Sequence, residues 1–264
     1  MHIGLIGFGS IGRELHKRLA EDPINTVTAL TRSPIPEAPR GLAQVQSLDA
    51  LLAAQPDVVV ECAGHSAVQT YAVDVLQSGT ALMLASQGAL ADQELLSALQ
   101  SAADNAGTQL IFPSGAIGGL DLLRACSADG PVDVMYQGIK PPKAWAGSRA
   151  EESVSLNDLR QPHVFFQGTG REATLAFPKN ANVVAALALA GAGFDRLQVE
   201  LIADPEATGN THRYSVTSPV CKFEINIENA PSAGNARTSM TTVLSILMDI
   251  RAFAAQCSKR RDSE

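Results

Sequence analysis

The sequence predicts an α/β fold, with a doubly wound parallel sheet in the first part of the chain and an α+β region in the second. Three observations support this prediction. The composition, 45% hydrophobic and 18% charged over 264 residues, is typical of a globular chain. Up to residue 113, continuously apolar runs alternate with helical patterns, as in βαβ units with buried strands. Beyond it, residues 222–228 alternate apolar and polar side chains, as in a sheet with one covered face.

The elements of the first part follow from the apolar runs and from the capping residues between them. Strands are predicted at residues 2–6, 27–30, 57–62, 80–85 and 108–112. Helices are predicted where Ile11, Leu15 and Leu19 recur at helical spacing, at 48–54 after the N-cap Ser47, from Ser66 to Gly79, and from Asp92 to Gly107. The proline-rich residues 34–39 are predicted to form a surface loop.

The second part is predicted to contain its own sheet, one long helix and a closing helix. The long helix covers about residues 178–190, and the closing helix, rich in Ala, Leu and Met, covers about 236–256. We therefore expect domains at residues 1–115 and 116–235. Residues 236–264 are expected to form a helix that packs back on the first domain.

The charge balance disfavours polyanionic partners. The formal net charge is −7, whereas nucleic acids and anionic membranes bind clustered cations. One basic cluster, residues 259–261, is interpreted as a solvated helix end. The apolar start is too short for a signal peptide, and we expect no apolar stretch long enough to span a bilayer.

The cysteines indicate a reducing compartment. Cys62, Cys126, Cys221 and Cys257 are widely spaced and form no Cys-x-x-Cys pair. This spacing suggests neither a zinc site nor a disulfide framework, and no metal site is predicted. We expect a cytoplasmic protein.

A glycine-rich turn lies between the first predicted strand and the first predicted helix. Gly7, Gly9 and Gly12 form a GxGxxG pattern, which is weak evidence alone and stronger in this position. The glycines allow a tight turn, a close backbone approach to a pyrophosphate and packing of the helix on the strand. The helix N-terminus, at Ser10 and Ile11, offers N–H groups to the phosphates. We interpret the stretch as the dinucleotide-binding turn of a Rossmann-type domain; the alternative is a plain βα turn.

The end of the second predicted strand bears on the choice between NAD and NADP. An acidic residue there would hold the ribose diol of NAD, but the sequence reads Thr31-Arg32-Ser33. A guanidinium flanked by hydroxyls suits the 2′-phosphate of NADP, so we predict that NADP is accepted, and the preference between NADP and NAD stays open. The alternative is that Arg32 is simply an exposed loop residue.

The surroundings of the five histidines do not single out a catalytic residue. His65 follows the C-terminal end of a predicted parallel strand, where doubly wound sheets bind ligands, and is a candidate on position alone. From the residues around it, in the stretch GNTHR, we would expect His212 to be a strand residue that faces solvent.

Five stretches, together with the glycine turn, resemble the L-aspartate dehydrogenase family. They are PSGAIGGLDLL (113–123), GIKPPKAW (138–145), FPKNANVVAALALAG (177–191), GNTHRYSV (209–216) and NARTSMTT (235–242). They span nearly the whole chain in the expected order. The resemblance implies reversible NAD(P)-dependent oxidation of L-aspartate to iminoaspartate, which hydrolyses to oxaloacetate and ammonia or enters NAD biosynthesis.

The resemblance also implies roles for single residues. His212 would be the catalytic histidine, titrating near neutrality to handle a proton, and Ala116 and Asn182 would contact the cofactor. A dicarboxylate substrate needs cationic or hydroxyl partners, for which we favour Lys140 and Ser114. Further candidates are Lys143, Arg171, Lys179 and Arg213.

Several alternatives stay open. The nearest are related oxidoreductases such as homoserine dehydrogenase or dihydrodipicolinate reductase. An aldehyde dehydrogenase would need Cys62 or Cys126 as an activated nucleophile. A non-catalytic NADP-binding sensor would keep the glycine turn without needing His212. The alternating strand and the long apolar helix suggest a homodimer, with the second domain binding substrate and a second subunit.

Overall fold

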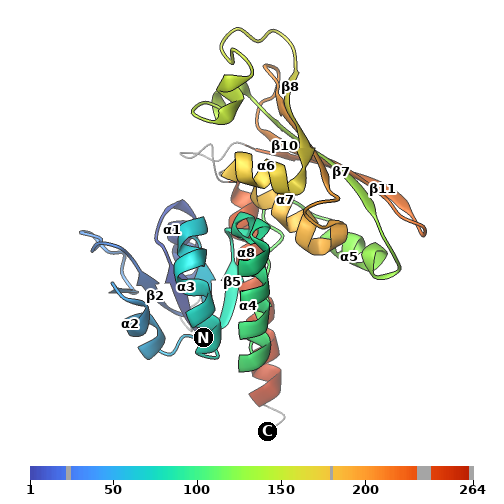
Figure 1. The fold of residues 1–264 in the computed structure, drawn as a ribbon. Coiled ribbons are helices and arrows are strands. Elements are labelled where there is room, and N and C mark those ends of the chain that lie inside the picture. The colour runs from blue at the N-terminus through green and yellow to red at the C-terminus, as the bar shows by residue number, and fades with distance from the viewer. Residues whose placement is uncertain (22–24, 179–180, 231–238, 262–264) are drawn as a thin grey trace. The chain divides into compact units, whose positions relative to one another are not determined.

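The computed structural model describes residues 1–21, 25–178, 181–230 and 239–261. For residues 259–261 it describes the backbone alone. The chain divides into two compact units (Figure 1). Unit 1 comprises Met1–Pro113 and Thr242–Glu264, and unit 2 comprises Ser114–Thr241. We describe each unit by itself.

Unit 1 is built on a six-stranded parallel sheet in the order β3-β2-β1-β4-β5-β6. The strands are β1 His2–Ile6, β2 Thr26–Leu30, β3 Leu42–Val45, β4 Val58–Glu61, β5 Ala81–Leu84 and β6 Leu110–Ile111. Ile6 pairs with both Leu30 and Glu61, so β1, β2 and β4 end at the same edge. Because connecting loops at that edge differ in direction on either side of β1, this is where such sheets bind ligands. The predicted doubly wound sheet is confirmed.

The helices of unit 1 lie close to the predicted ones, although the helix expected from Ser66 to Gly79 begins at His65 and ends at Gln77. They are α1 Ser10–Leu19, α2 Leu48–Ala53, α3 His65–Gln77 and α4 Gln93–Ala106, with a 3₁₀ helix at Gln87–Ala91. Ser47 Oγ accepts from the N–H of Ala50 at 3.2 Å, and Asp92 caps α4. Gly107 ends α4 in the left-handed conformation, with φ +62°. Local capping chemistry therefore explains why these boundaries were predictable.

The C-terminal helix α8 (Met240–Arg261) belongs to the core of unit 1. Its residues Val243, Ile246, Leu247, Ile250 and Phe253 are buried in one cluster with the strands β1, β2, β4 and β5. By length and composition residues 240–258 could nevertheless cross a membrane, although Asp249 and Arg251 interrupt the apolar stretch. The reason is that a helix covering a sheet needs a similar apolar composition.

Unit 2 contains a five-stranded mixed sheet in the order β11-β10-β7-β9-β8. The strands are β7 Asp133–Lys140, β8 His163–Thr169, β9 Gln198–Ala203, β10 Asn210–Thr217 and β11 Lys222–Asn229. The helices are α5 Leu120–Ala128, α6 Gly170–Ala176 and α7 Asn182–Leu187, which continues into a π-helical turn, Ala188–Ala192. The predicted α+β character and the alternating strand at 222–228 are confirmed.

Several secondary-structure predictions differ from the structure, and in unit 2 the helices α5 and α6 were not predicted. The helix expected from residue 178 begins at Asn182 in the described chain. Helix α6 ends before it at Ala176, and the C-cap Phe177 has a non-helical backbone (φ −129°, ψ 57°). Strand β3 was not predicted, because its four residues are neither continuously apolar nor fully buried. The expected start of the closing helix, at 236, falls outside the described residues; the described helix begins at Met240.

Candidate functional site

The glycine turn of unit 1 is packed so closely that two of its glycines have no room for a side chain. Gly7 has φ +97°, and a Cβ added there would lie 2.7 Å from the Cβ of Ala63. A Cβ at Gly12 would lie 2.7 Å from the carbonyl oxygen of Gly7. Gly9 is different, because a Cβ there would meet no atom within 4 Å. The turn therefore leaves its open space at Gly9, the N-cap of α1.

A cavity of about 620 Å³ lies beside this turn, within unit 1. Its lining comes from the ends of β1, β2 and β4 and from α3: Ile6, Gly7, Phe8, Gly9, Leu30, Thr31, Arg32, Gln46, Cys62, Ala63, Ser66, Ala67, Thr70 and Tyr71. Thr31 Oγ1 is buried without a hydrogen-bond partner. Ser10 and Ile11 are the first residues of α1 but are not among the lining residues. The open space at Gly9 and the unpaired hydroxyl of Thr31 fit a bound dinucleotide.

Arg32 lies beside the cavity, after the end of β2. Its side chain is exposed and lines the cavity, next to Thr31. The described lining contains no Asp or Glu. A cavity with a guanidinium and without a carboxylate is suited to an additional phosphate.

Glu61, which the sequence analysis did not single out, organises the edge of the sheet beside the turn. It ends β4 with 0% of its surface exposed. Its Oε1 accepts from the N–H groups of Ala63 (2.7 Å) and Gly64 (2.8 Å). Its carboxylate also accepts from the backbone N–H (3.0 Å) and hydroxyl (3.1 Å) of Ser86, after β5. One side chain thus fixes two loops, and Ala63 is the residue pressed against Gly7.

The burial of Glu61 affects its own protonation and that of its neighbour. Burial raises the pKa of the carboxyl, and its four hydrogen bonds oppose that change. Burial and the adjacent Glu61 raise the pKa of the Cys62 thiol. Cys62 Sγ lies 3.4–3.5 Å from the carbonyl oxygens of Ile6 and Gly7. With its pKa raised, the Cys62 thiol stays protonated, unlike the activated nucleophile of an aldehyde dehydrogenase.

In unit 2, side chains of the sheet hold the loop that contains Ser114 and Ala116. Tyr214 Oη donates to the carbonyl oxygen of Gly118 at 2.6 Å. Asn229 Nδ2 donates to the carbonyl oxygen of Ala116 at 3.3 Å. Because side chains alternate along a strand, Tyr214 and His212 share one face of β10. The structure therefore brings the Ser114–Ala116 loop and His212 to the same face of this sheet.

His212 is buried and paired with a tyrosine, in contrast to the solvent-facing histidine that its surroundings in sequence suggest. Only 5% of its surface is exposed. Its Nδ1 lies 2.8 Å from Tyr136 Oη, and the two rings stack at an interplanar angle of 20°. His212 pairs across the ladder with Gly138, where a Cβ would lie 2.9 Å from Tyr136 Oη. Glycine at 138 therefore gives the tyrosine the space to reach the histidine.

The expectation that His212 titrates near neutrality is wrong for the free protein. Burial, followed by the charge of Lys140, lowers the pKa of His212 to about 3. The imidazole is therefore neutral at physiological pH, with one ring nitrogen protonated and a lone pair on the other that can accept a proton. Burial also raises the pKa of Tyr136, which stays a phenol.

Lys140 lies on the same face of β7 as Tyr136, two and four residues along from Gly138 and Tyr136. Its Nζ lies 4.9 Å from the ring centroid of the fully buried Trp145. Burial lowers the pKa of Lys140 to about 8, so the ammonium is still largely protonated at pH 7. A cation held near a neutral histidine is placed to attract an anionic ligand.

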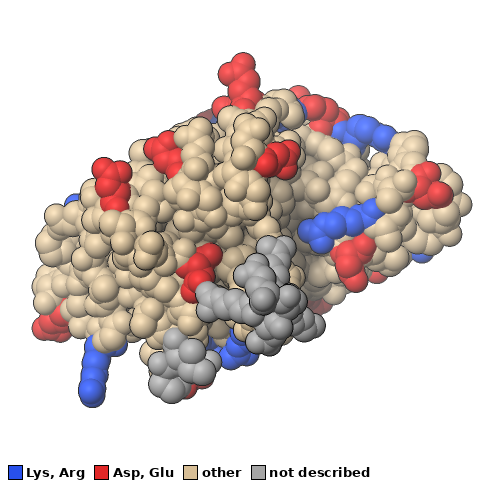
Figure 2. Space-filling view, turned by 90° about the horizontal axis from the view of Figure 1, so that it is seen from below, with Lys and Arg blue, Asp and Glu red and all other residues tan. Residues whose placement is uncertain are grey.

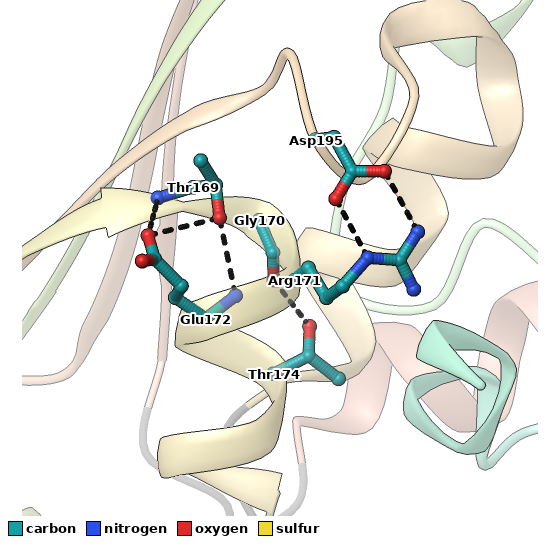
Figure 3. Close-up of polar contacts among 6 residues, drawn as sticks. All are labelled: Thr169, Gly170, Arg171, Glu172, Thr174 and Asp195. Carbon is teal, nitrogen blue, oxygen red and sulfur yellow. Dashed lines mark hydrogen bonds and ion pairs between the residues drawn. The ribbon is translucent and has the colours of Figure 1, made fainter. Parts of the chain in front are cut away.

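The other candidate cations are placed differently. Arg171 forms a bidentate ion pair with Asp195 (2.6 and 2.8 Å) at the start of α6, beside the capping box of Thr169 and Glu172 (Figure 3). Lys143 is exposed. Arg213 is exposed and its Nε donates to Asn226 at 3.4 Å on β10 and β11. Lys179 lies outside the described residues.

Two further candidates are placed outside the clusters just described. Asn182 is the first residue of α7, and its side chain is exposed. His65 is the first residue of α3. The side chains of residues 259–261, expected at a solvated helix end, lie outside the described residues.

Charged residues are scattered singly over the face drawn in Figure 2. Lys and Arg do not form a continuous patch on that face. Together with the net charge of −7, this distribution gives no footprint for a nucleic acid there.

Two family models match the chain. The model described as "Aspartate dehydrogenase, C-terminal" matches residues 121–253. The model described as "Homoserine dehydrogenase, NAD binding domain" matches residues 7–113. The second match shows a NAD-binding domain over these residues, and the chain is an NAD(P)-dependent amino-acid dehydrogenase.

Relatives match along almost the entire chain. An L-aspartate dehydrogenase of Ruegeria pomeroyi is 41% identical, covering 95% of this chain and 92% of the relative. One of Cupriavidus necator is 39% identical, covering 94% and 95%. The crystal structure of aspartate dehydrogenase from Thermotoga maritima superposes with a TM-score of 0.79 at 31% identity, covering 96% of both chains. A homoserine dehydrogenase bound to NADPH, with a TM-score of 0.61 and 12% identity, shares the fold. The chain belongs to the L-aspartate dehydrogenase family.

Proposed function

We propose that this chain catalyses the reversible NAD(P)-dependent oxidation of L-aspartate to iminoaspartate, which water converts to oxaloacetate and ammonia. One observation carries the proposal beyond family membership. In unit 2 a neutral, tyrosine-paired histidine and a partly buried lysine share one face of a sheet. This combination offers a proton acceptor and an anion partner for an amino-dicarboxylate.

His212 is proposed as the catalytic residue that accepts the proton leaving the amine. A nicotinamide cofactor, when bound, would supply the hydride acceptor for this oxidation. With Nδ1–H donated to Tyr136, Nε2 carries the lone pair that accepts the proton. Tyr136 is then a positioning residue that selects this tautomer. In the reverse direction His212 returns the proton to the amine.

Lys140 and Ser114 are proposed to bind the carboxylates of the substrate. Pairing the buried ammonium with a carboxylate offsets the free-energy cost of its burial. Ser114, on the loop held by Tyr214 and Asn229, supplies a hydroxyl donor.

We propose that the phosphates of the cofactor bind at Gly7, Gly9, Ser10, Ile11 and Gly12, and that Arg32 binds the 2′-phosphate of NADP. The open space at Gly9 and the carboxylate-free lining of the cavity support this assignment. Ala116 and Asn182 stay proposed cofactor contacts, on the family resemblance. Steady-state kcat/KM for NADP and NAD, with an Arg32→Ala variant, tests the preference. A wild-type preference for NAD would contradict it.

The wider setting is also a proposal. We propose unit 1 as the dinucleotide-binding domain and unit 2 as the substrate and dimerisation domain of a cytoplasmic homodimer that acts in NAD biosynthesis or aspartate metabolism. The four free thiols support a reducing compartment. Light scattering on the purified chain tests the dimer.

The experiment that tests the activity is a substrate panel. Reduction of NAD and NADP is followed with L-aspartate, D-aspartate, L-glutamate and L-homoserine. We expect turnover with L-aspartate alone. Turnover with L-homoserine would point to a homoserine dehydrogenase, and nucleotide binding without turnover would favour a sensor.

A further inference from the structure

Two cysteines of unit 2 meet although they are distant in sequence. Cys126 belongs to α5, and Cys221 ends the short turn between β10 and β11. They are 95 residues apart, yet their Sγ atoms lie 3.3 Å apart. A disulfide bond has a length of about 2.0 Å, so bond formation needs a sulfur displacement on the order of 1 Å.

The surroundings of Cys221 hold it in this position. Ser218 Oγ accepts from the N–H of Cys221 at 3.0 Å and donates to its carbonyl oxygen at 2.9 Å. The backbone N–H of Ser218 donates to the same carbonyl at 3.0 Å. Cys221 is partly exposed, whereas Cys126 is 2% exposed. A small reagent can therefore reach Cys221 first, with Cys126 immediately behind it.

The other two cysteines are in different settings. Cys62 is a partly buried thiol beside Glu61 in unit 1, and its Sγ lies 3.5 Å from the carbonyl oxygen of Ile6. Cys257 packs against the core of unit 1 from α8. Neither is among the described contacts of Cys126 and Cys221. The chain thus carries one thiol pair and two internal controls.

We propose that Cys126 and Cys221 form a redox modification site, which a low-molecular-weight disulfide oxidises to an intramolecular disulfide. The Cys221 thiolate attacks the reagent, RSSR, which breaks the reagent's S–S bond, forms Cys221–S–SR and releases one RSH. The Cys126 thiolate then attacks the Cys221 sulfur and releases the second RSH. Two protein thiols are oxidised and one reagent disulfide is reduced, with both protons leaving on the released thiols.

The disulfide would fix the β10–β11 turn to α5. This helix follows directly on the Ser114–Gly119 loop, and Tyr214 of β10 binds the same loop. Oxidation therefore restrains α5 relative to β10, the strand that carries His212, and α5 is continuous with the Ser114–Gly119 loop. Because the linkage closes a long loop, the oxidised protein should unfold at a higher temperature than the reduced protein.

The test uses the full-length protein, reduced, freed of reductant and incubated with oxidised glutathione. Intact mass, thiol counting after denaturation and peptide mapping follow the products. We expect the wild type to lose two of its four thiols, retain no glutathione and yield a cross-linked peptide containing Cys126 and Cys221. Dithiothreitol should restore all four thiols and the lower unfolding temperature.

Variants make the order of events testable. Cys126→Ala should accumulate a glutathione adduct at Cys221 on the order of tenfold above wild type, because the resolving thiol is missing. Cys126→Ser is the second variant if alanine perturbs folding, and Cys257→Ser should oxidise as wild type does. A wild type that keeps four thiols, cross-links another pair, or accumulates the adduct as Cys126→Ala does would overturn the proposal.

Discussion

The glycine turn of unit 1 and the His212 cluster of unit 2 are built in opposite ways. The turn lies within six consecutive residues, Gly7–Gly12, and works through backbone geometry and cleared space. The His212 cluster depends on strand pairing, since Tyr136 and His212 are 76 residues apart. It contains buried titratable side chains, whereas the glycine turn itself contains none. Substitutions in the turn should therefore act through sterics, and those in the cluster through charge and proton transfer.

The largest expected effect is at His212, where a substitution should change turnover but not nucleotide binding. His212→Ala removes the proposed proton acceptor, so kcat should fall by ~10²–10⁴-fold. The Kd for NADPH, measured by fluorescence, should stay within about twofold of the wild-type value. His163→Ala, at an exposed strand position, is the matched control. Unchanged kcat in His212→Ala would remove His212 from the chemistry.

At Lys140 we expect a smaller effect, on substrate binding. Lys140→Met keeps the length of the side chain but removes the charge, so KM for L-aspartate should rise by ~10–100-fold. Lys143→Met is the control, because Lys143 is exposed near the end of the same segment. Equal KM values in the two variants would show that Lys140 does not bind a carboxylate.

Glu61 tests whether unit 1 also depends on a side chain. Glu61→Gln places an N–H₂ group among the N–H donors of Ala63, Gly64 and Ser86, which should cost about 1–3 kcal/mol of unfolding free energy. Because Ala63 lines the cavity, KM for the cofactor should rise while kcat changes little. A lower kcat with an unchanged cofactor KM would argue against a positioning role.

Substitutions at Gly12 and Gly9 test two different steric roles, close backbone packing at Gly12 and open space for the nucleotide at Gly9. Gly12→Ala should lower the free energy of unfolding by about 1–3 kcal/mol, because the new Cβ meets the carbonyl of Gly7. Gly9→Ala should fold normally, because the Cβ meets nothing, but should weaken nucleotide binding by occupying the open space. Chemical denaturation and nucleotide titration of both variants measure this. Equal losses of stability in Gly12→Ala and Gly9→Ala would contradict the different steric roles of the two glycines.

The last expected effect is a gradual one, in the pH dependence of stability. The folded state keeps His212 neutral with a pKa of about 3, whereas the unfolded chain binds a proton near pH 6.5. Its contribution is therefore fully present above pH 6.5 and declines as the pH falls toward 3, by about 1 kcal/mol per pH unit. Denaturation of wild type and His212→Asn at several pH values isolates this slope. A pH-independent difference between them would contradict the buried neutral histidine.

The elements of unit 1 were predictable because their signals are local. Continuously apolar strands, the Ser47 and Asp92 caps and the left-handed Gly107 are each specified within a few residues. Short β3 gave no such signal. Glu61 was hidden at the end of a predicted strand, although a carboxylate at the end of an apolar run was a signal for a buried hydrogen-bonded acid.

The His212 cluster was predictable only in part. The resemblance pointed to His212 and Lys140, but the partner Tyr136 and the space at Gly138 follow from the pairing of β7 with β10. Register between distant strands is set by the whole sheet and is not written in either segment. The lowered pKa of His212 depends on burial and on Lys140, and so it also required the structure.

The most direct test of the central claim is NADPH and NADH consumption with oxaloacetate, with and without ammonia. We predict consumption that requires ammonia and that yields L-aspartate, identified by chromatography. Consumption with oxaloacetate alone, yielding a hydroxy acid, or no consumption by folded protein that still binds nucleotide, would contradict an aspartate dehydrogenase.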